Sequence, residues 1–229
     1  MLDPVVWIGG WASNLACWRT SLEGLYPSRE HSFLDAHAIL EEPGLLQIAA
    51  NSLPPNGTMI AWSLGSLILH RSLASGELNT SCRLVSVCPI FDFCREGGPW
   101  PPAALFRMTR KLHGNRESTL AEFYALVQGD SSVSQAQTEA WKIQSRAYSL
   151  DSLLAGLAAL NDIKVMRTSL PAHDRHTFFA SAQDPLAPPN REDFPGPRWI
   201  GFPKGHLPFL DYPDLLRPLL SGKAKMASI

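Results

Sequence analysis

The sequence predicts an α/β fold, in which a mostly parallel sheet of about six strands has helices on both faces and is interrupted by a helical insertion. Short apolar runs, closed by glycine, proline or polar residues, have the length of single buried strands. They are apolar throughout rather than alternating, which is typical of parallel sheets covered on both faces. Helical segments alternate with them, as parallel connections require. The expected strands are residues 5–8, 31–34, 58–62, 83–88, 176–181 and 198–201.

Helices are expected in two groups. Residues 13–26 follow the first strand, with Ser13 or Asn14 as the N-cap, and residues 64–75 directly follow the third strand and end near Gly76. The second group lies between the fourth and fifth strands, in a stretch that shows no convincing strand of its own. The helices expected there are residues 102–113, 117–128, 133–148 and 151–160.

The 229 residues are expected to form a single domain, because one hydrophobic core can still grow at this length. We expect residues 1–94 and 163–229 to form the core of this domain and residues 95–162 to form a helical lid. The last residues, 221–229, are expected to be a frayed tail.

Composition excludes several classes of protein. Apolar residues make up 45% and charged residues 18%, which is typical of a globular protein and not of a disordered one. A net charge of −1 disfavours a nucleic-acid binder that relies on overall basic charge. No apolar run reaches the ~18 residues of a membrane span, and residues 1–10 lack the basic start of a signal peptide. Four cysteines without CxxC spacing indicate buried, reduced thiols in a cytoplasmic protein.

The segment Ala61-Trp-Ser-Leu-Gly65 stands where an expected strand passes into an expected helix with almost no loop. A nucleophile elbow has this arrangement, because its serine occupies a strained turn and small flanking residues let two backbones pass closely. The usual pattern is G-x-S-x-G, and Ala61 stands in place of the first glycine. The alternative is an ordinary junction in which Ser63 only caps the helix. The strand–turn–helix context favours Ser63 as a nucleophile.

A nucleophilic serine needs a histidine base and an acid that orients it, and in this architecture the chain order is serine, acid, histidine. Asp184 follows the fifth expected strand and His206 follows the sixth, so both would emerge at the carboxyl edge of a parallel sheet. The alternatives are an Asp-Pro turn and a loop histidine. Asp92, after the fourth strand, is a rival acid. We favour Asp184 because its setting fits the usual order.

A tetrahedral oxyanion needs two hydrogen-bond donors. One is expected to be the backbone N–H of Leu64, directly after Ser63. The other is expected to be the backbone N–H of Trp11, because Gly10 lets the chain turn after the first strand. The alternative at Gly9 and Gly10 is a plain glycine turn.

No metal or other cofactor is expected. His173 and His176 have the spacing of metal ligands, but no carboxylate or cysteine with fitting spacing lies nearby. We interpret these two residues, together with His31 and His37, as surface or strand-entry histidines.

Four segments carry a resemblance to known proteins. They are Gly9-Gly-Trp-Ala-Ser-Asn-Leu-Ala-Cys-Trp18, Trp62-Ser-Leu-Gly-Ser66, Gln183-Asp-Pro-Leu-Ala-Pro-Pro189 and Gly205-His-Leu-Pro-Phe-Leu-Asp-Tyr-Pro213. Together they resemble the α/β-hydrolase superfamily and, more narrowly, the pimeloyl-[acyl-carrier protein] methyl ester esterases of biotin synthesis, over about residues 5–220. The chain departs from that family in having Gly9 where a histidine is usual and Ala61 where a glycine is usual. The family's N-terminal antiparallel hairpin is also expected to be absent.

The resemblance implies roles for six residues of the triad, the oxyanion hole and the acyl pocket. They are Ser63, Asp184 and His206 as the triad, the amides of Trp11 and Leu64 as oxyanion donors, and Trp11 with Trp62 as substrate contacts.

The expected lid carries a basic stretch. Residues 95–146 hold seven basic and five acidic residues, and the part from 100 to 116 holds no acid at all. Acyl carrier proteins are acidic, so such a surface would suit the docking of one. The alternative is a solvated helix face. The four cations expected to dock the carrier are Arg107, Arg110, Lys111 and Arg116.

We therefore expect a monomeric serine carboxylesterase that hydrolyses the methyl ester of a pimeloyl-type chain on acyl carrier protein through an acyl-enzyme. It is expected to bind neither nucleic acid nor a membrane. One alternative is another α/β-hydrolase, such as a small-ester esterase, an acyl thioesterase or a carbon–carbon hydrolase. A non-catalytic binding module is the other, and the complete triad disfavours it.

Overall fold

The computed structural model describes residues 3–170, 175–189 and 199–220. Six strands form one sheet in which all neighbours are parallel, in the order β2-β1-β3-β4-β5-β6. The predicted fold class is confirmed. The strands are β1 (Val5–Ile8), β2 (His31–Leu34), β3 (Thr58–Trp62), β4 (Arg83–Val87), β5 (His176–Ala180) and β6 (Trp199–Gly201).

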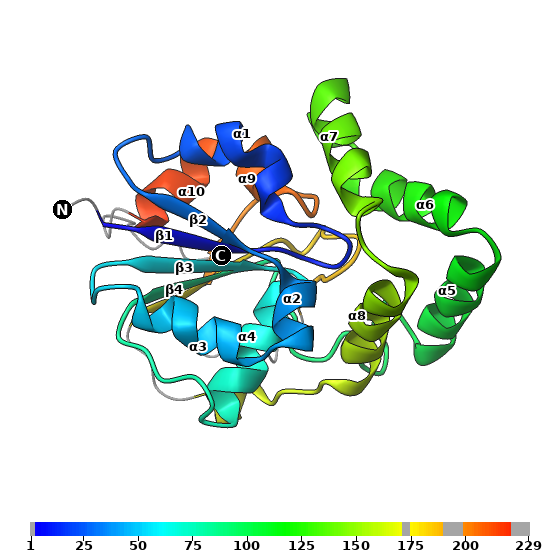
Figure 1. Ribbon diagram of the computed structural model, residues 1–229, viewed down its shortest axis with the longest axis horizontal. Coiled ribbons are helices and arrows are strands. Elements are labelled where there is room, and N and C mark those ends of the chain that lie inside the picture. Colours follow the sequence, from blue (N-terminus) through cyan, green and yellow to red (C-terminus); the bar gives the residue numbers. More distant parts are fainter. Residues whose placement is uncertain (1–2, 171–174, 190–198, 221–229) are drawn as a thin grey trace.

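The central strands are buried, as their continuous apolar character predicts. Every residue of β1 and β3 is buried, whereas the edge strand β2 is partly exposed along its length. The central strands are buried because helices cover both faces of the sheet (Figure 1). On one face lie α1 (Arg19–Glu23), α9 (Pro208–Asp211) and α10 (Pro213–Leu220), and on the other lie α3 (Gly44–Asn51) and α4 (Leu64–Ala74).

The strand order reverses at β1, which has β2 on one side and β3 on the other. In open α/β sheets, ligands bind beyond the carboxyl ends of the strands at such a switch point. Gly9 follows β1 directly and Ser63 follows β3 directly. The fold therefore brings the glycine turn and the proposed nucleophile to the same place.

Four helices between β4 and β5 lie beyond the carboxyl ends of the strands (Figure 1). These cap helices are α5 (Pro102–Gly114), α6 (Arg116–Gln128), α7 (Gln135–Ser145) and α8 (Leu150–Asp162). They occupy the segments in which the sequence predicts helices, although α7 is shorter at both ends than expected. The cap meets the core chiefly where α8 contacts α2 and α4, and where α7 contacts the 3₁₀ turn η1 (Leu15–Trp18).

Four short helices are absent from the sequence prediction: α2 (Ala36–Glu41), α3, α9 and α10. Each has eight residues or fewer, which is too short for a clear helical period. The predicted helix 13–26 is also shorter, because the chain forms η1 before α1 begins. Asn14 is its N-cap, accepting a hydrogen bond from the Ala16 N–H at 2.9 Å.

Several predictions fall on residues outside the described ranges. These are the frayed tail 221–229, the start of the last strand at Arg198, and His173. Among the described residues, no helix combines the length and the apolar character that crossing a membrane requires.

Helix α4 packs directly on the end of β1, and Gly65 permits this contact. A Cβ atom at Gly65 would lie 2.4 Å from the Gly9 carbonyl oxygen and 2.8 Å from Ile8 Cγ2. The obstacle is mostly backbone, so α4 would have to shift to relieve it.

We predict that Gly65→Ala lowers the free energy of unfolding by ~1–3 kcal/mol, the usual cost of overpacking a core. Gly114→Ala is the matched control, because a Cβ atom there meets nothing within 4 Å. Urea denaturation of both variants measures the difference. Equal stability of the two variants would contradict the close packing at Gly65.

Candidate active site

Ser63 is the single residue between β3 and α4, and its backbone is held from both sides. Its N–H donates to the Val87 carbonyl at 3.0 Å, which keeps it in the sheet. Its carbonyl accepts from the N–H groups of Ser66 and Leu67 at 2.9 and 3.2 Å, which begins α4. The resulting φ of 54° and ψ of −121° lie in a region that serine seldom adopts. The strained strand-to-helix turn that the sequence predicts is therefore present.

The turn after β1 lies against this elbow. A Cβ atom on Gly10 would lie 3.2 Å from Ser63 Cβ and 3.0 Å from the Trp62 ring, so a glycine is needed there. Trp11 is the next residue in this turn. On the other side of Ser63, Leu64 opens α4, and the first N–H groups of a helix have no acceptor within it. The two amides predicted to form an oxyanion hole thus belong to segments that adjoin Ser63.

His206 and Asp184 complete a hydrogen-bonded chain with Ser63. His206 Nε2 lies 3.0 Å from Ser63 Oγ, and Nδ1 lies 2.7 and 2.9 Å from the two Asp184 oxygens. A carboxylate can only accept, so Nδ1 carries the proton and Nε2 is free to accept from the serine hydroxyl. The three residues predicted from their order in the chain therefore meet in space.

The Asp184 carboxylate is buried and held in place by its own loop. Oδ1 accepts from the N–H groups of Leu186 and Ala187 at 2.8 and 3.0 Å. These bonds fix the plane of the carboxylate toward His206. Ser63 is 9% exposed, against 3% for Asp184 and 1% for His206, so the serine is the triad member most accessible to a substrate.

The rival acid, Asp92, lies elsewhere. Its Oδ2 lies 3.6 Å from Lys164 Nζ, and its backbone forms a bridge with the same residue. The hydrogen-bond partner of His206 is Asp184, which is the acid that the sequence favours.

Trp62 contacts His206 and holds its backbone. Its Nε1–H donates to the His206 carbonyl at 2.9 Å, and the two rings lie 5.3 Å apart. The indole also packs against Trp18 and Phe209 and is 1% exposed. The structure thus places Trp62 in the interior beside His206, and a role in lining an acyl pocket stays a prediction.

Cys88 lies close enough to the triad to raise the question of a metal site. Its Sγ, an Asp184 oxygen and a His206 nitrogen lie within 4.8 Å of one another. Burial, and then the neighbouring carboxylate, raise the pKa of the Cys88 thiol well above its usual range. A protonated thiol is a poor metal ligand, and the carboxylate already accepts from the imidazole. This donor set fits a hydrogen-bonded relay and does not fit a metal ion.

The turn at Trp11 is tied to the cap helices. The Trp11 indole N–H donates to the Leu153 carbonyl of α8 at 2.9 Å, and the Trp141 indole N–H of α7 donates to the Ala12 carbonyl at 3.0 Å. Ala12 itself has a φ of 51°, so the turn is sharp and constrained. The cap therefore holds the backbone from which one oxyanion donor is expected.

His37 forms a third link between this turn and the cap. It is buried and lies in α2, so the interpretation of His37 as a surface or strand-entry histidine is wrong. Its Nε2 accepts from the Ala12 N–H at 2.9 Å, and its Nδ1–H donates to the Ser152 carbonyl at 2.9 Å. Gly156 of α8 makes room for it, because a Cβ atom there would lie 2.7 Å from His37 Cε1. No local pattern around His37 signals this role, since both partners are distant in the sequence.

Burial lowers the pKa of His37, against smaller opposing effects of Asp35 and Glu41. A neutral imidazole is the form that can accept from the Ala12 N–H, so the geometry and the lowered pKa agree. The ring also lies 4.6 Å from that of Tyr148, which encloses it further.

The cations predicted to dock a carrier protein differ in their surroundings. Lys111 pairs with Glu122 at 2.5 Å, and Arg116 donates to the carbonyls of Ser145 and Arg146. Arg107 and Arg110 are exposed on α5 with no ion pair in the part of the chain that the structure describes. These last two are the cations available to a partner.

Two of the other histidines, His31 and His176, have structural partners. His31 accepts from the Trp7 indole N–H at 3.0 Å, and His176 Nε2 lies 2.8 Å from Ser86 Oγ inside the protein. His31 opens β2 and His176 opens β5, which agrees with their interpretation as strand-entry histidines.

No protein-family model and no curated protein sequence matches this chain. Solved structures do match. An esterase from Exiguobacterium antarcticum is 17% identical with a TM-score of 0.79, covering 96% of this chain and 91% of its own. A hydrolase from Oleispira antarctica is 17% identical with a TM-score of 0.73, covering 97% and 90%. A bromoperoxidase from Bacillus anthracis is 14% identical with a TM-score of 0.72, covering 96% and 92%. The chain therefore has the α/β-hydrolase fold.

The lowered pKa of His37 makes stability depend on pH. The unfolded histidine takes up a proton near pH 6.5, whereas the folded one stays neutral until a lower pH. The resulting stability is complete above pH 6.5 and is lost as the pH falls. We predict that replacing His37 with Gln removes up to ~1.4 kcal/mol per pH unit from the slope of unfolding free energy below pH 6.5.

Urea denaturation at a series of pH values between 7 and 5 measures this slope. His70, whose pKa burial lowers to about 4, is present in both proteins, so its contribution cancels in the comparison. An identical slope in the wild type and in the His37→Gln variant would show that His37 titrates normally.

Proposed function

We propose that this protein is a serine hydrolase that cleaves carboxylic esters. The observation that carries the proposal is the unbroken hydrogen-bonded chain from Asp184 through His206 to Ser63. A serine on a strained elbow, with a histidine of the correct tautomer beside it, is the arrangement that acyl transfer requires.

In the proposed reaction, Ser63 Oγ attacks the ester carbonyl while His206 Nε2 takes the hydroxyl proton. The Asp184 carboxylate stays ionised and stabilises the imidazolium that forms. The amides of Trp11 and Leu64 are proposed to hold the oxyanion of the tetrahedral intermediate. His206 then gives its proton to the leaving alcohol, which departs and leaves an acyl-enzyme. His206 next takes a proton from a water molecule, whose oxygen attacks the acyl carbon. The bond from Ser63 Oγ to the acyl carbon then breaks, His206 returns the proton to Oγ, and the carboxylic acid leaves.

The fold alone does not select this chemistry. The similar structures are named as esterases and hydrolases, and one is named as a bromoperoxidase. Function depends on the site and not on the fold. The triad geometry therefore supports ester hydrolysis more directly than the likeness does.

The substrate that we propose is the methyl ester of a pimeloyl-type acyl chain on acyl carrier protein. Support comes from the four segments that resemble the esterases of biotin synthesis, including the elbow at Ser63. It also comes from Arg107 and Arg110, which are exposed one helical turn apart on α5 and would attract an acidic carrier. Methanol would leave in the first half of the reaction. A small free ester remains the alternative substrate, and it would need no cationic surface.

We predict that Ser63→Ala lowers the turnover of p-nitrophenyl butyrate by ~10⁴ or more, because nucleophile and base act as a unit. Ser75→Ala, an exposed serine at the end of the same helix, is the matched control and should keep full activity. Circular dichroism checks that both variants are folded. An esterase activity that survives the loss of the Ser63 hydroxyl would rule out the proposed nucleophile.

The two candidate acids give opposite expectations. We predict that Asp184→Asn lowers kcat by ~10⁴, because an amide at this position favours the wrong histidine tautomer. Asp92→Asn should change kcat little, since its contact is with Lys164. Steady-state kinetics on the same ester compares them, and the reverse ranking would move the acid to Asp92.

The carrier-protein proposal is tested by reversing two charges, Arg107→Glu with Arg110→Glu. We predict that kcat/KM for a carrier-bound methyl ester falls tenfold or more, roughly 1.4 kcal/mol, while turnover of p-nitrophenyl acetate stays within about twofold. The difference should shrink as salt rises, because exposed charges are screened beyond ~10 Å at 0.1 M. Lys111 is left unchanged because Glu122 pairs with it.

The control variant carries Arg19→Glu with Arg217→Glu, two exposed cations of the core helices, and changes the net charge equally. These two cations pair with Glu23 and Asp214, so circular dichroism must first show that the control variant is folded. It should hydrolyse the carrier-bound ester normally. If both double variants lose the same activity, net charge and not the α5 surface is responsible. If neither double variant loses activity, Arg107 and Arg110 belong to a solvated helix face and do not dock a carrier.

A further inference from the structure

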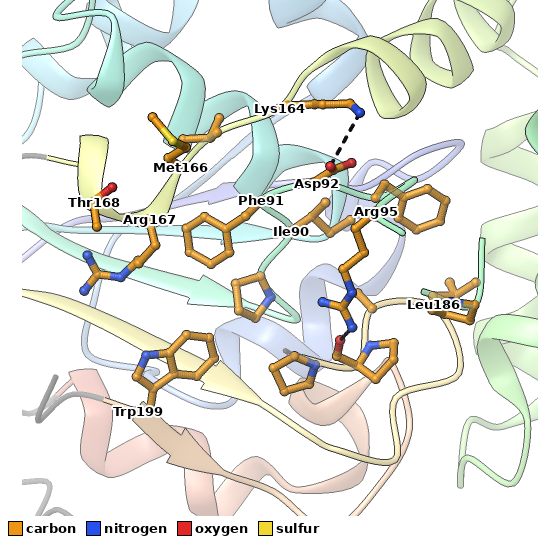
Figure 2. A pocket seen from close by; sticks show the side chains of 17 residues that line it. Ile90, Phe91, Asp92, Arg95, Lys164, Met166, Arg167, Thr168, Leu186 and Trp199 are labelled. Atoms are coloured by element: carbon orange, nitrogen blue, oxygen red, sulfur yellow. Dashed lines mark hydrogen bonds and ion pairs between the residues drawn. The ribbon is translucent and has the colours of Figure 1, made fainter. Parts of the chain in front are cut away.

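A cavity of about 500 Å³ lies beside the loop that carries Asp184 (Figure 2). Its wall is formed by three segments and one strand residue: residues 89–93 with Arg95 and Pro99, residues 164–168, residues 186–189, and Trp199. None of the three triad residues lines it. Its volume is in the range of small-molecule sites, ~300–1,000 Å³.

Most of the cavity wall is apolar. Phe91, Leu186 and Trp199 are side chains whose surface is largely buried, and several prolines complete the lining. Figure 2 shows Phe91 between the two ends of the cavity, with Trp199 below it. Met166 lines the cavity as well and is 73% exposed, although it is a large apolar side chain. An apolar chain or ring bound in the cavity would remove the exposed Met166 side chain from water.

Arg167 brings a positive charge to this apolar wall. Its guanidinium lies 4.9 Å from the centre of the Phe178 ring, and Figure 2 shows it at the same end of the cavity as Trp199. Its Nε is buried and has no hydrogen-bond partner, and no carboxylate pairs with it among the described residues. Burial lowers the pKa of Arg167, which reflects the cost of a partly desolvated charge. An anion would offset this cost, and a guanidinium binds a carboxylate especially well.

The other charged groups of the cavity already have contacts. Arg95 Nη2 donates to the Pro188 carbonyl at 2.8 Å, and Lys164 Nζ lies 3.6 Å from Asp92 Oδ2. Asp92 Oδ1 is buried without a donor, so a ligand with an ammonium group is the competing possibility. The wall carries three cations and one carboxylate, however, and this excess of positive charge favours an anion.

We propose that this cavity binds a small apolar carboxylate, whose carboxylate contacts Arg167 and whose chain or ring lies between Phe91 and Trp199. The site is separate from Ser63 and does not rest on the proposed esterase activity. The cavity is nevertheless next to the triad's acid. Residues 186–189 line the cavity and belong to the loop that carries Asp184, and the amides of Leu186 and Ala187 hold the Asp184 carboxylate.

Isothermal titration calorimetry with three six-carbon probes tests the charge preference. Hexanoate should bind at least tenfold more tightly than hexanol or hexylamine. The Ser63→Ala variant should bind hexanoate as the wild type does, and Arg167→Gln should bind it at least tenfold more weakly. Arg107→Gln, an exposed cation of the cap, is the control and should bind normally. Preferential binding of hexylamine, or unchanged binding by Arg167→Gln, would overturn the proposal.

Indole N–H resonances locate the bound probe. Trp199 lines the cavity, whereas Trp62 lies at the triad with its N–H bonded to the His206 carbonyl. Hexanoate should shift the Trp199 signal, assigned with a Trp199→Phe variant, and should leave the Trp62 signal in place. A shift at Trp62 with none at Trp199 would place hexanoate in the catalytic site and contradict a second site.

Discussion

The backbone of Ser63 belongs to a strand and a helix at once, and the site depends on this shared position. Its N–H remains in the sheet and its carbonyl starts α4, so no loop can relax the turn between them. The left-handed φ of 54° is the cost of this arrangement. Gly65 and Gly10 keep the surrounding backbones close enough to hold it. The hydroxyl is thereby fixed where a histidine from a distant loop can reach it.

The cap helices are bonded directly to the turn that adjoins this elbow. Two indoles and one imidazole join the turn after β1 to helices α7 and α8, through Trp11, Trp141 and His37. Gly156 allows α8 to approach this closely. The expected oxyanion donor at Trp11 is consequently positioned by the cap as well as by β1. A displacement of α8 would thus change the geometry of the turn that adjoins Ser63.

The sequence predicts the parts of this site that follow from local pattern and chain order. The elbow has a local signature, and the acid and the histidine follow their own strands, so Ser63, Asp184 and His206 were identifiable. The roles of Trp62 and His37 were not, because their partners lie 144 and 115 residues away and no periodicity reports such contacts. The same limit applies to the fold. Apolar strands and long helices are predictable from their sequence patterns. The short helices α2 and α9, and the 3₁₀ turn η1 that precedes α1, depend on caps and tertiary packing that a short segment does not encode.

An activated serine is the central claim, and its reactivity is measurable without knowing the substrate. A fluorophosphonate reacts with a serine that a histidine activates and spares ordinary hydroxyls. Intact-mass spectrometry of the treated protein should show one added phosphonyl group, peptide mapping should place it on Ser63, and unfolding the protein beforehand should prevent it. No adduct on the folded protein, or an adduct on a residue other than Ser63, would contradict a catalytic triad at this site.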